Sequence, residues 1–481
     1  MVEQITLIQL LRVGPKPAKA LYEGLGVSQP TLSRLLLQHG ESILRFGKAR
    51  QSQYALRRAI GPHANFPLYR VTATGELLQW GVLHPIMPSA YLVETFATAF
   101  FEARTDVHQG LPWYLQDLRP QGFLGRSLAR FYGPQLGLPI DPTRWNDDQT
   151  LLALANIGHD APSNLLLGEE SASHFQTNSF FLNSGNVIQT SPDDQRQQRY
   201  PLLANLALSG EVVGSSAGGE QPKFNTTIQR AGQLVQVLVK FSAPQANAIT
   251  ERWRSLLVCE HLAFQVLRNF FPCSVSELLL VENNGAPQIF LEVPRFDRQS
   301  ERGRLGVVSL KSLDDEFVGL ASDWPKVTAA LVRAGKLSEQ VAQQVQSIYA
   351  FGVLIGNADM HTGNLSFMVD DVTSPKPKFQ LAPIYDMLPM ALAPRASGQI
   401  PDALPPPKIS VNPPLAVWQA MLPLAIQYWR SVAEHEKVAD DVRQIARAQA
   451  EIIDSAAPFV SNSLTSVIPA QAGIPQSKGN Q

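Results

Sequence analysis

The segment 354–368, LIGNADMHTGNLSFM, places an acid, an imidazole and an amide between two apolar runs. Asp359 and Asn364 are followed by an apolar run, a polar turn and the segment FQLAPIYDM, which carries Asp386. Since a hairpin returns its end to its beginning, this pattern predicts that Asp386 lies near Asp359 and Asn364. The alternative is a buried turn whose polar groups satisfy only its own backbone.

Such a set of side chains suits phosphoryl transfer. One aspartate orients the attacking hydroxyl or accepts its proton, while an asparagine and a second aspartate give oxygen ligands to Mg²⁺. The metal neutralises charge that builds on the phosphate oxygens. The sequence therefore favours a catalytic loop over a purely structural turn.

A lysine in an apolar strand is the second candidate. Lys240 lies in the alternating run LVQVLVKFS, and Glu260, in the helical segment that follows, is its best partner. The alternative is an edge lysine that reaches solvent. Before this strand, the loop GSSAGGEQPKF offers the N–H groups of Gly218 and Gly219 to phosphates and Lys223 as a second cation.

The surrounding elements predict a two-lobed α+β enzyme that binds a nucleotide. Strand patterns dominate from about residue 205 and helical periods dominate after about residue 300. Residues 90–103, AYLVETFATAFFEA, are expected to be helical. We expect a winged helix-turn-helix-like domain over 1–85, a first lobe over 86–300, a helical second lobe over 301–460 and a disordered tail over 461–481.

The first 85 residues resemble a DNA-binding module. Helical segments end at glycines around an LGVS turn, and PLYRVTATGELLQWGVL reads as the strand pair of a wing. This region holds ten basic and four acidic residues, whereas the whole chain has a net charge of −1. We expect its helix 29–39 to enter the groove of duplex DNA; the alternative is a module that only packs on the enzyme and restrains it. The residues expected at base edges are Ser28, Gln29, Thr31 and Arg34, and those expected at phosphates include Arg57 and Arg58.

Composition narrows the protein class. Hydrophobic residues make up 44 % of the 481 residues and charged residues 17 %, which is a globular composition. The two cysteines, Cys259 and Cys273, lack zinc-ligand spacing and favour a reducing compartment. No apolar run reaches the length of a membrane span, so we expect a cytoplasmic protein without membrane contact.

Four segments, GGEQPK at 218–223, RFDR at 295–298, GNADMHTGN at 356–364 and APIYDM at 382–387, occur in this order. They resemble the HipA-like toxin serine/threonine kinases over about residues 90–455. The resemblance implies a bilobed, protein-kinase-like fold that uses ATP and Mg²⁺ to phosphorylate a protein hydroxyl, an aminoacyl-tRNA synthetase being one such substrate in the family. It implies the following roles: Asp359 as catalytic base, Asn364 and Asp386 as metal ligands, Lys240 on the phosphates, and Phe296 and His361 near the nucleotide.

The resemblance also implies regulation. In the family, a serine of the small-residue loop is autophosphorylated, which ejects the loop and silences the enzyme. Ser215 aligns best, but Ser216 is adjacent and the loop is one residue longer than the commonest form, so both stay candidates. The fused N-terminal module resembles the longer, YjjJ-type (HipH-like) branch of the family.

Two other functions use the same residues. One is a small-molecule phosphotransferase on the same fold, and the other is a DNA-binding regulator whose kinase-like part only senses a nucleotide. A deep acceptor pocket lined by acids would favour the first, whereas a wide basic face would favour a macromolecular target. The presence of Asp359, Asn364, Asp386 and Lys240 together argues against a pure sensor.

Overall fold

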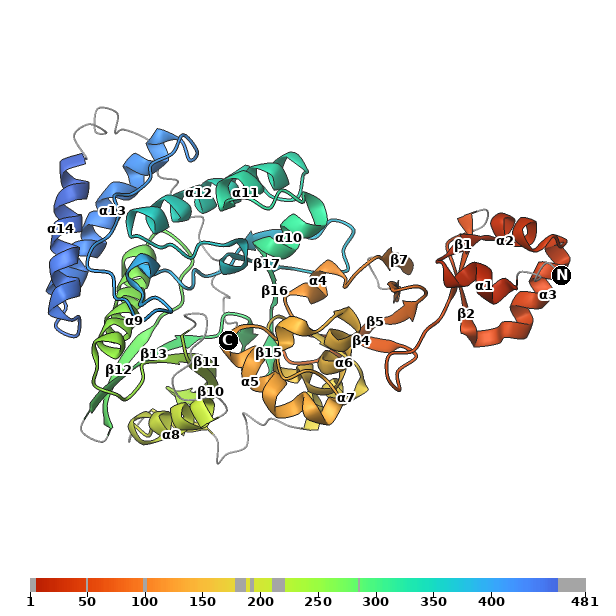
Figure 1. The fold of residues 1–481 in the computed structure, drawn as a ribbon, viewed down its shortest axis with the longest axis horizontal. Helices are drawn as coiled ribbons and strands as arrows, with labels where there is room; N and C mark the ends of the chain where they lie inside the picture. Colours follow the sequence, from red (N-terminus) through yellow and green to blue (C-terminus); the bar gives the residue numbers. More distant parts are fainter. Residues whose placement is uncertain are drawn as a thin grey trace, which may run out of the picture.

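The computed structural model describes residues 6–48, 51–97, 102–177, 187–190, 194–209, 221–283 and 286–456. A small N-terminal module stands apart from a large body, to which it is joined by a narrow stretch of chain and sheet (Figure 1). Ser215, Ser216, Gly218, Gly219 and the expected tail 461–481 lie outside the described residues. In the described part, no helix is long and apolar enough to cross a membrane.

The N-terminal module has three helices and a small sheet. Leu7, Leu11, Leu21 and Leu32 form its buried centre. Ser28 caps the third helix by accepting a hydrogen bond from the backbone N–H of Thr31, as Ser, Thr, Asp and Asn commonly do at helix starts. The elements are α1 (Leu7–Arg12), α2 (Ala18–Leu25), α3 (Gln29–His39), β1 (Lys16–Pro17), β2 (Ile43–Phe46) and β3 (Gln53–Leu56), with sheet order β1-β3-β2.

The strand pair that was expected to form a wing belongs to the next unit. Strands β4 (Phe66–Val71) and β5 (Leu77–Ile86) do pair, but they lie inside a five-stranded sheet of order β7-β6-β5-β4-β8. Most side chains of the second half of β5 are buried, as in a central strand and unlike an exposed wing. The hairpin of the N-terminal module is β2–β3 instead, and the expected boundary at residue 85 falls inside β5.

The middle unit consists of this sheet and the helices around it. The segment 90–103, expected to be helical, contributes β6 (Ala90–Thr95), which pairs on one side with β5 and on the other with β7 (Arg104–His108). The sheet is completed by β8 (Leu165–Leu167), and the helices are α4 (Trp113–Gln116), α5 (Gly122–Tyr132), α6 (Asp147–Ile157) and α7 (Glu169–Thr177). The region expected as one lobe over 86–300 is therefore two units.

The small lobe follows, with a second five-stranded sheet of order β12-β13-β11-β10-β9. Phe224, Phe241, Phe290 and Tyr200 pack together in its core. The expected lysine strand is present, and β12 and β13 pair as a hairpin whose tip, 284–285, lies outside the described residues. The elements are α8 (Arg196–Ser209), α9 (Ala248–Leu267), β9 (Ile188–Gln189), β10 (Lys223–Arg230), β11 (Gln233–Phe241), β12 (Glu277–Asn283) and β13 (Ala286–Pro294).

The large lobe is mainly helical, with a three-stranded sheet beneath the helices. Helices α13 and α14 lie beside α9 at the end of the body that is farthest from the N-terminal module (Figure 1). The described helices are α10 (Leu310–Phe317), α11 (Trp324–Arg333), α12 (Glu339–Leu354), α13 (Leu415–Glu434) and α14 (Asp440–Ala456). The sheet has the order β16-β17-β18, from Gly306–Ser309, Ser366–Val369 and Phe379–Leu381, and a short pair, β14 (Arg298–Gln299) and β15 (Gly303–Arg304), precedes it.

Candidate active site

A buried cluster of three charges lies between the lobes. The Nζ atom of Lys240, at the end of β11, is 2.6 Å from Oε1 and 2.8 Å from Oε2 of Glu260 on α9. The same ammonium group donates to Oδ1 of Asp386, which follows β18. Lys240 and Glu260 are almost fully buried, whereas the Asp386 side chain is 32 % exposed. The predicted Lys–Glu ion pair is therefore formed, and one lysine joins an acid from each lobe.

The charged groups in this cluster shift one another's pKa values. Burial would raise the pKa of Asp386, but the attraction of Lys240 and Lys223 outweighs burial and lowers that pKa to about 2. Burial raises the pKa of Glu260, an effect that Lys240 only partly offsets. Burial opposes the charge on Lys240, yet Asp386 and Glu260 together raise its pKa. At neutral pH, a protonated Lys240 thus faces an ionised Asp386.

The loop between α12 and β17 carries Asp359 and Asn364. Asp359 is exposed, and its main-chain carbonyl accepts a hydrogen bond from Asn364 Nδ2 at 2.8 Å. Asn357 connects this loop to the charge cluster, since its Oδ1 accepts from the Asp359 N–H at 3.0 Å and its Nδ2 donates to the Asp386 carbonyl at 3.1 Å. Asn357 lies in the segment GNADMHTGN, but the sequence pattern alone gave it no role.

The hairpin β17–β18 returns the chain to this loop, as the pattern predicted. Tyr385 donates from its hydroxyl to the Gly363 carbonyl at 2.8 Å, and its ring stacks on Phe296 with centroids 5.9 Å apart. Asp386 has a φ of 51°, an uncommon backbone conformation for a residue with a side chain. The His361 side chain accepts from the Gly363 N–H at 3.0 Å and so caps the short turn of the loop.

A cavity of about 680 Å³ extends from this cluster to the middle unit. It is lined by Lys223, by the three charged residues of the cluster and by the stacked rings of Phe296 and Tyr385. A further part of its wall comes from α5 and α6 of the middle unit and is mostly apolar. Residues of that wall include Phe123, Leu124, Leu128, Leu154 and Ile157.

The residues present fit a magnesium–nucleotide complex better than a metal held by protein alone. In the described part of the chain, no group of three or more His, Cys, Asp or Glu side chains could hold an ion. Magnesium at phosphoryl-transfer sites usually takes only one or two carboxylates and completes its shell with phosphate oxygens and water. Asp386, with Asn364 on the neighbouring loop, supplies a donor set of that size.

The predicted DNA-contacting residues divide into two groups. Ser28, Gln29 and Arg34 are exposed on or just before α3, and Thr31 is half-buried. Arg58 is different, because its guanidinium forms a two-point ion pair with Asp148 at 2.5 and 2.8 Å.

The environments of the two arginines show why the expectation for Arg58 was wrong. Its Nε donates to the Ile86 carbonyl at 3.1 Å, so the side chain fastens the N-terminal module to the middle unit. This guanidinium is therefore not available for a DNA phosphate. Arg57 is half-buried and lies close enough to His84 to lower, after burial itself, the pKa of that imidazole.

Two family models match the middle unit and the two-lobed part of the chain, in that order. Residues 62–176 match the family described as YjjJ-like toxin, middle domain, and residues 215–457 match the HipA-like C-terminal domain. The chain is 38 % identical to Toxin YjjJ of Escherichia coli (strain K12), covering 93 % of this chain and 97 % of that protein. A crystal structure of a Helicobacter pylori proinflammatory kinase, CtkA, aligns with a TM-score of 0.35 and 17 % identity, over 53 % of this chain and 97 % of that one.

The match over residues 215–457 places the two lobes and their charge cluster in the HipA-like class. Together with the middle-domain match and the relative of similar length, it shows that the chain belongs to the YjjJ-like toxin family. The start of the middle-domain match at residue 62 agrees with the structure, in which the middle sheet begins with β4.

Proposed function

We propose that the protein is a serine/threonine protein kinase of toxin type, which transfers the γ-phosphoryl group of ATP with the help of Mg²⁺ in the cytoplasm. The observation that carries the proposal is the contact of Lys240 with both Glu260 and Asp386. In protein kinases, a strand lysine held by a helix glutamate contacts the phosphates, and a nearby aspartate holds the metal. Membership of the HipA-like class supports the same assignment.

Each residue then has a distinct task. When bound, Mg·ATP supplies the phosphoryl group and an electrophilic phosphorus atom. Glu260 holds Lys240 by two oxygen contacts, which fixes the direction of the ammonium group toward the cleft. Asp386 and Asn364 would supply oxygen ligands to the metal, and Asp359 would accept the proton of the attacking hydroxyl. Asn357 holds Asp359 and Asp386 in a common frame through their main chains.

The cavity argues for a protein acceptor over a small molecule. Three acids line it beyond the charge cluster, but all are already bonded to protein donors: Asp117 to Ser309, and Asp160 and Asp297 to arginines. They are therefore not free to bind the hydroxyl groups of a small acceptor. Asp359, in contrast, is exposed on its loop, where the side chain of a large partner can reach it.

Autophosphorylation of Ser215 or Ser216 is part of this proposal. Both serines lie in the segment that joins α8 to β10, outside the described residues, and Lys223 opens β10 directly after it. A phosphoserine in this segment would compete with the ATP phosphates for Lys223 and Lys240.

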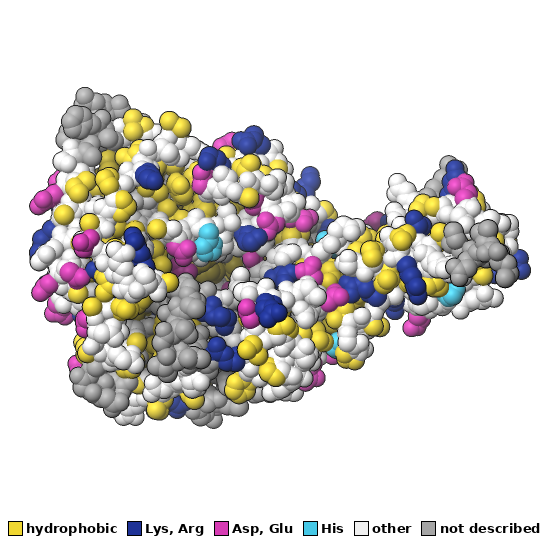
Figure 2. Space-filling model, viewed as in Figure 1, with side chains coloured by type: hydrophobic (Ala, Val, Ile, Leu, Met, Phe, Trp, Pro, Cys, Tyr) yellow, Lys and Arg dark blue, Asp and Glu magenta, His cyan; other side chains and the backbone are white. Residues whose placement is uncertain are grey.

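DNA binding by the N-terminal module is proposed as a second activity. Gln29 and Arg34 are exposed on α3, whose buried side packs through Leu32 on the other helices. Lys and Arg side chains also follow the narrow stretch that joins the module to the body (Figure 2). These features suit a helix that enters a groove while neighbouring cations contact phosphates.

The kinase assignment is tested by incubating the protein with γ-labelled ATP, Mg²⁺ and a cell lysate. We expect labelled protein bands that contain phosphoserine or phosphothreonine and that are missing with Asp359→Ala. Label that appears only in small molecules would favour the phosphotransferase alternative. Nucleotide binding without any transfer would favour the sensor alternative.

A further inference from the structure

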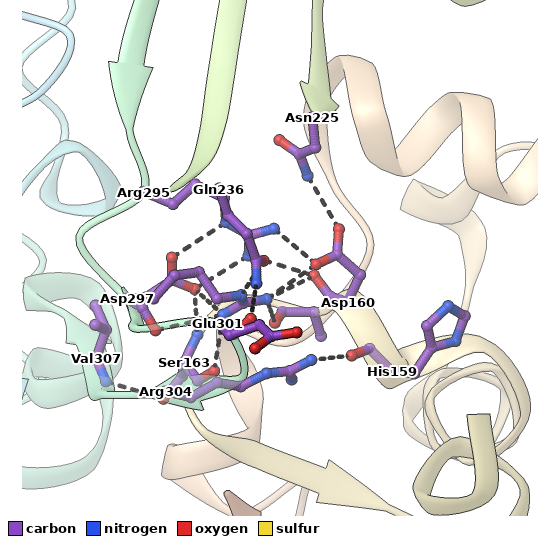
Figure 3. Close-up of polar contacts among 12 residues, drawn as sticks. His159, Asp160, Ser163, Asn225, Gln236, Arg295, Asp297, Glu301, Arg304 and Val307 are labelled. Carbon is purple, nitrogen blue, oxygen red and sulfur yellow. Dashed lines mark hydrogen bonds and ion pairs between the residues drawn. The ribbon is translucent and has the colours of Figure 1, made fainter. Parts of the chain in front are cut away.

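A second charge cluster lies where the middle unit meets both lobes (Figure 3). Asp160 ends the short turn after α6, whereas its charged partners come from residues 295–305, the segment that joins β13 of the small lobe to β16 of the large lobe. This segment is called the hinge below. The members of the cluster are Asp160, Arg295, Asp297, Arg298 and Arg304.

The Asp160 carboxylate contacts both the hinge and strand β10 of the small lobe. Asp160 Oδ1 lies 2.7 Å from Arg295 Nη1 and 3.0 Å from Arg298 Nη2. Its other oxygen, Oδ2, accepts a hydrogen bond from Asn225 Nδ2 at 3.1 Å. Asn225 is on β10, two residues after Lys223, and its neighbour across the sheet is Leu238. Asp160 and Asn225 are called the interlobe brace below.

The next residues of the middle unit are tied to the large lobe. Ser163 donates its N–H to Asp297 Oδ2 at 3.0 Å, and its hydroxyl oxygen accepts from the Val307 N–H at 2.9 Å. Val307 is on β16, which pairs with β17, the strand that begins two residues after Asn364. The segment 160–163 therefore contacts the small lobe, the hinge and the large lobe within four residues.

The contacts differ in how easily they can change. The guanidinium groups of Arg295 and Arg298 share the carboxylates of Asp160 and Asp297, and Arg304 is buried beside them, so loss of Asp160 would leave positive charge without enough partners, which is strongly destabilising. The Asn225–Asp160 hydrogen bond has a neutral donor on a half-buried side chain. It can therefore be removed while Arg295 and Arg298 keep their ion pairs with Asp160 and Asp297.

We propose that Asp160 is a positioning residue, which holds the small lobe at a set angle to the large lobe through Asn225. The middle unit thereby fixes the width of the cleft between Lys240 and the catalytic loop. Because Lys223 and Lys240 are direct neighbours across β10 and β11, a shift of β10 displaces both cations together. Closure of two lobes around a substrate commonly completes a catalytic site. The inference rests on the proposed kinase function for its consequence, but not for its geometry.

The test measures the angle between the lobes without requiring catalysis. Spin labels are placed at the exposed positions 233, at the start of β11, and 343, on α12. The background is Cys273→Ser in the full-length protein, since Cys259 is buried. Distance distributions are recorded without nucleotide for the wild-type residue, for Asn225→Ala and for Asn225→Asp. Gln229→Ala is the matched control, because Gln229 is on the same strand and face but roughly 13 Å further along.

Loss of the hydrogen bond in Asn225→Ala should broaden and displace the distance distribution. In Asn225→Asp, two facing carboxylates should displace it further, while Gln229→Ala should match the wild type. Calorimetry with Mg²⁺ and a non-hydrolysable ATP analogue should show affinity weakened about 3- to 10-fold in Asn225→Ala. Equal thermal midpoints will show that the fold is kept.

An unchanged distance distribution in both Asn225 variants would overturn the proposal that the interlobe brace sets the angle between the lobes. This holds for any measured affinity for the nucleotide analogue. A changed distribution with unchanged affinity would overturn its link to the nucleotide cleft. If the wild-type protein binds no nucleotide analogue, the proposed kinase function fails, and the distances measured without nucleotide still decide the brace.

Discussion

Lys240 Nζ lies within hydrogen-bond distance of both carboxylate oxygens of Glu260, at 2.6 and 2.8 Å, and both side chains are buried. This two-point contact fixes the lysine on the lobe opposite the loop that carries Asp359. A lysine held in this way cannot turn toward solvent, so its charge stays directed at the cleft.

Replacing Glu260 with glutamine should weaken the ion pair that positions Lys240. One charged contact is lost, and Lys240 is then held mainly by Asp386, away from the position at which it meets phosphates. We expect kcat/KM for ATP to fall about 10- to 100-fold, as for other misplaced catalytic groups. Glu251→Gln, in the first turn of the same helix, is the control and should keep the rate of the wild type. Equal rates in both variants would contradict the role of the ion pair.

Replacing Asp386 with asparagine should weaken magnesium-dependent nucleotide binding. The pKa of Asp386 is lowered to about 2, so the carboxylate is ionised at any pH used for assays and the variant removes a full negative charge. Nucleotide affinity measured across a magnesium titration should therefore lose most of its magnesium dependence. Asp370→Asn, near the tip of the same hairpin, should behave like the wild type. An unchanged titration for Asp386→Asn would count against this ligand.

Mass spectrometry of the purified active protein should find phosphate on Ser215 or Ser216. The same analysis of Asp359→Ala, made in the same host, should find none, because the mark is placed by the protein itself. Phosphate on neither serine, or equal phosphate in both proteins, would refute the regulation proposed for this segment.

Arg34 and Arg58 should behave differently in DNA binding by the full-length protein. Arg34→Ala should reduce sequence preference, since Arg34 is exposed on α3. Arg58→Ala should instead lower the thermal midpoint, because Asp148 loses its two-point partner. Binding of the wild-type protein should fall with salt by a log–log slope of roughly −0.9 per phosphate contacted. No binding to any duplex at low salt would leave restraint of the kinase as the function of the module.

The residues of the candidate site could be located from the sequence because their signals are local. The Asp359–Asn364 spacing, the hairpin that returns Asp386 and the strand that carries Lys240 each lie within one short segment. The cap of α3 by Ser28 is local in the same way, and the structure confirms it.

The errors arose where distant contacts decide the structure. Residues 90–95 read as a helix by period, but they form β6 because β5 and β7 bind both of its edges. From the sequence, Arg58 was expected to be a surface cation, but in the fold it is paired with Asp148, which lies 90 positions away in the chain. The Asp160–Asn225 contact likewise joins two units that no sequence pattern relates.

The most direct test of the central claim compares the wild-type protein with Asp359→Ala. Transfer of the labelled γ-phosphoryl group from Mg·ATP to protein is measured in both, and circular dichroism confirms that both are folded. Because Asp359 is exposed and is the proposed base, we expect the variant to stay folded and to lose transfer by about 10²- to 10⁴-fold. Equal transfer by the two proteins would contradict the assignment of this loop as the catalytic centre.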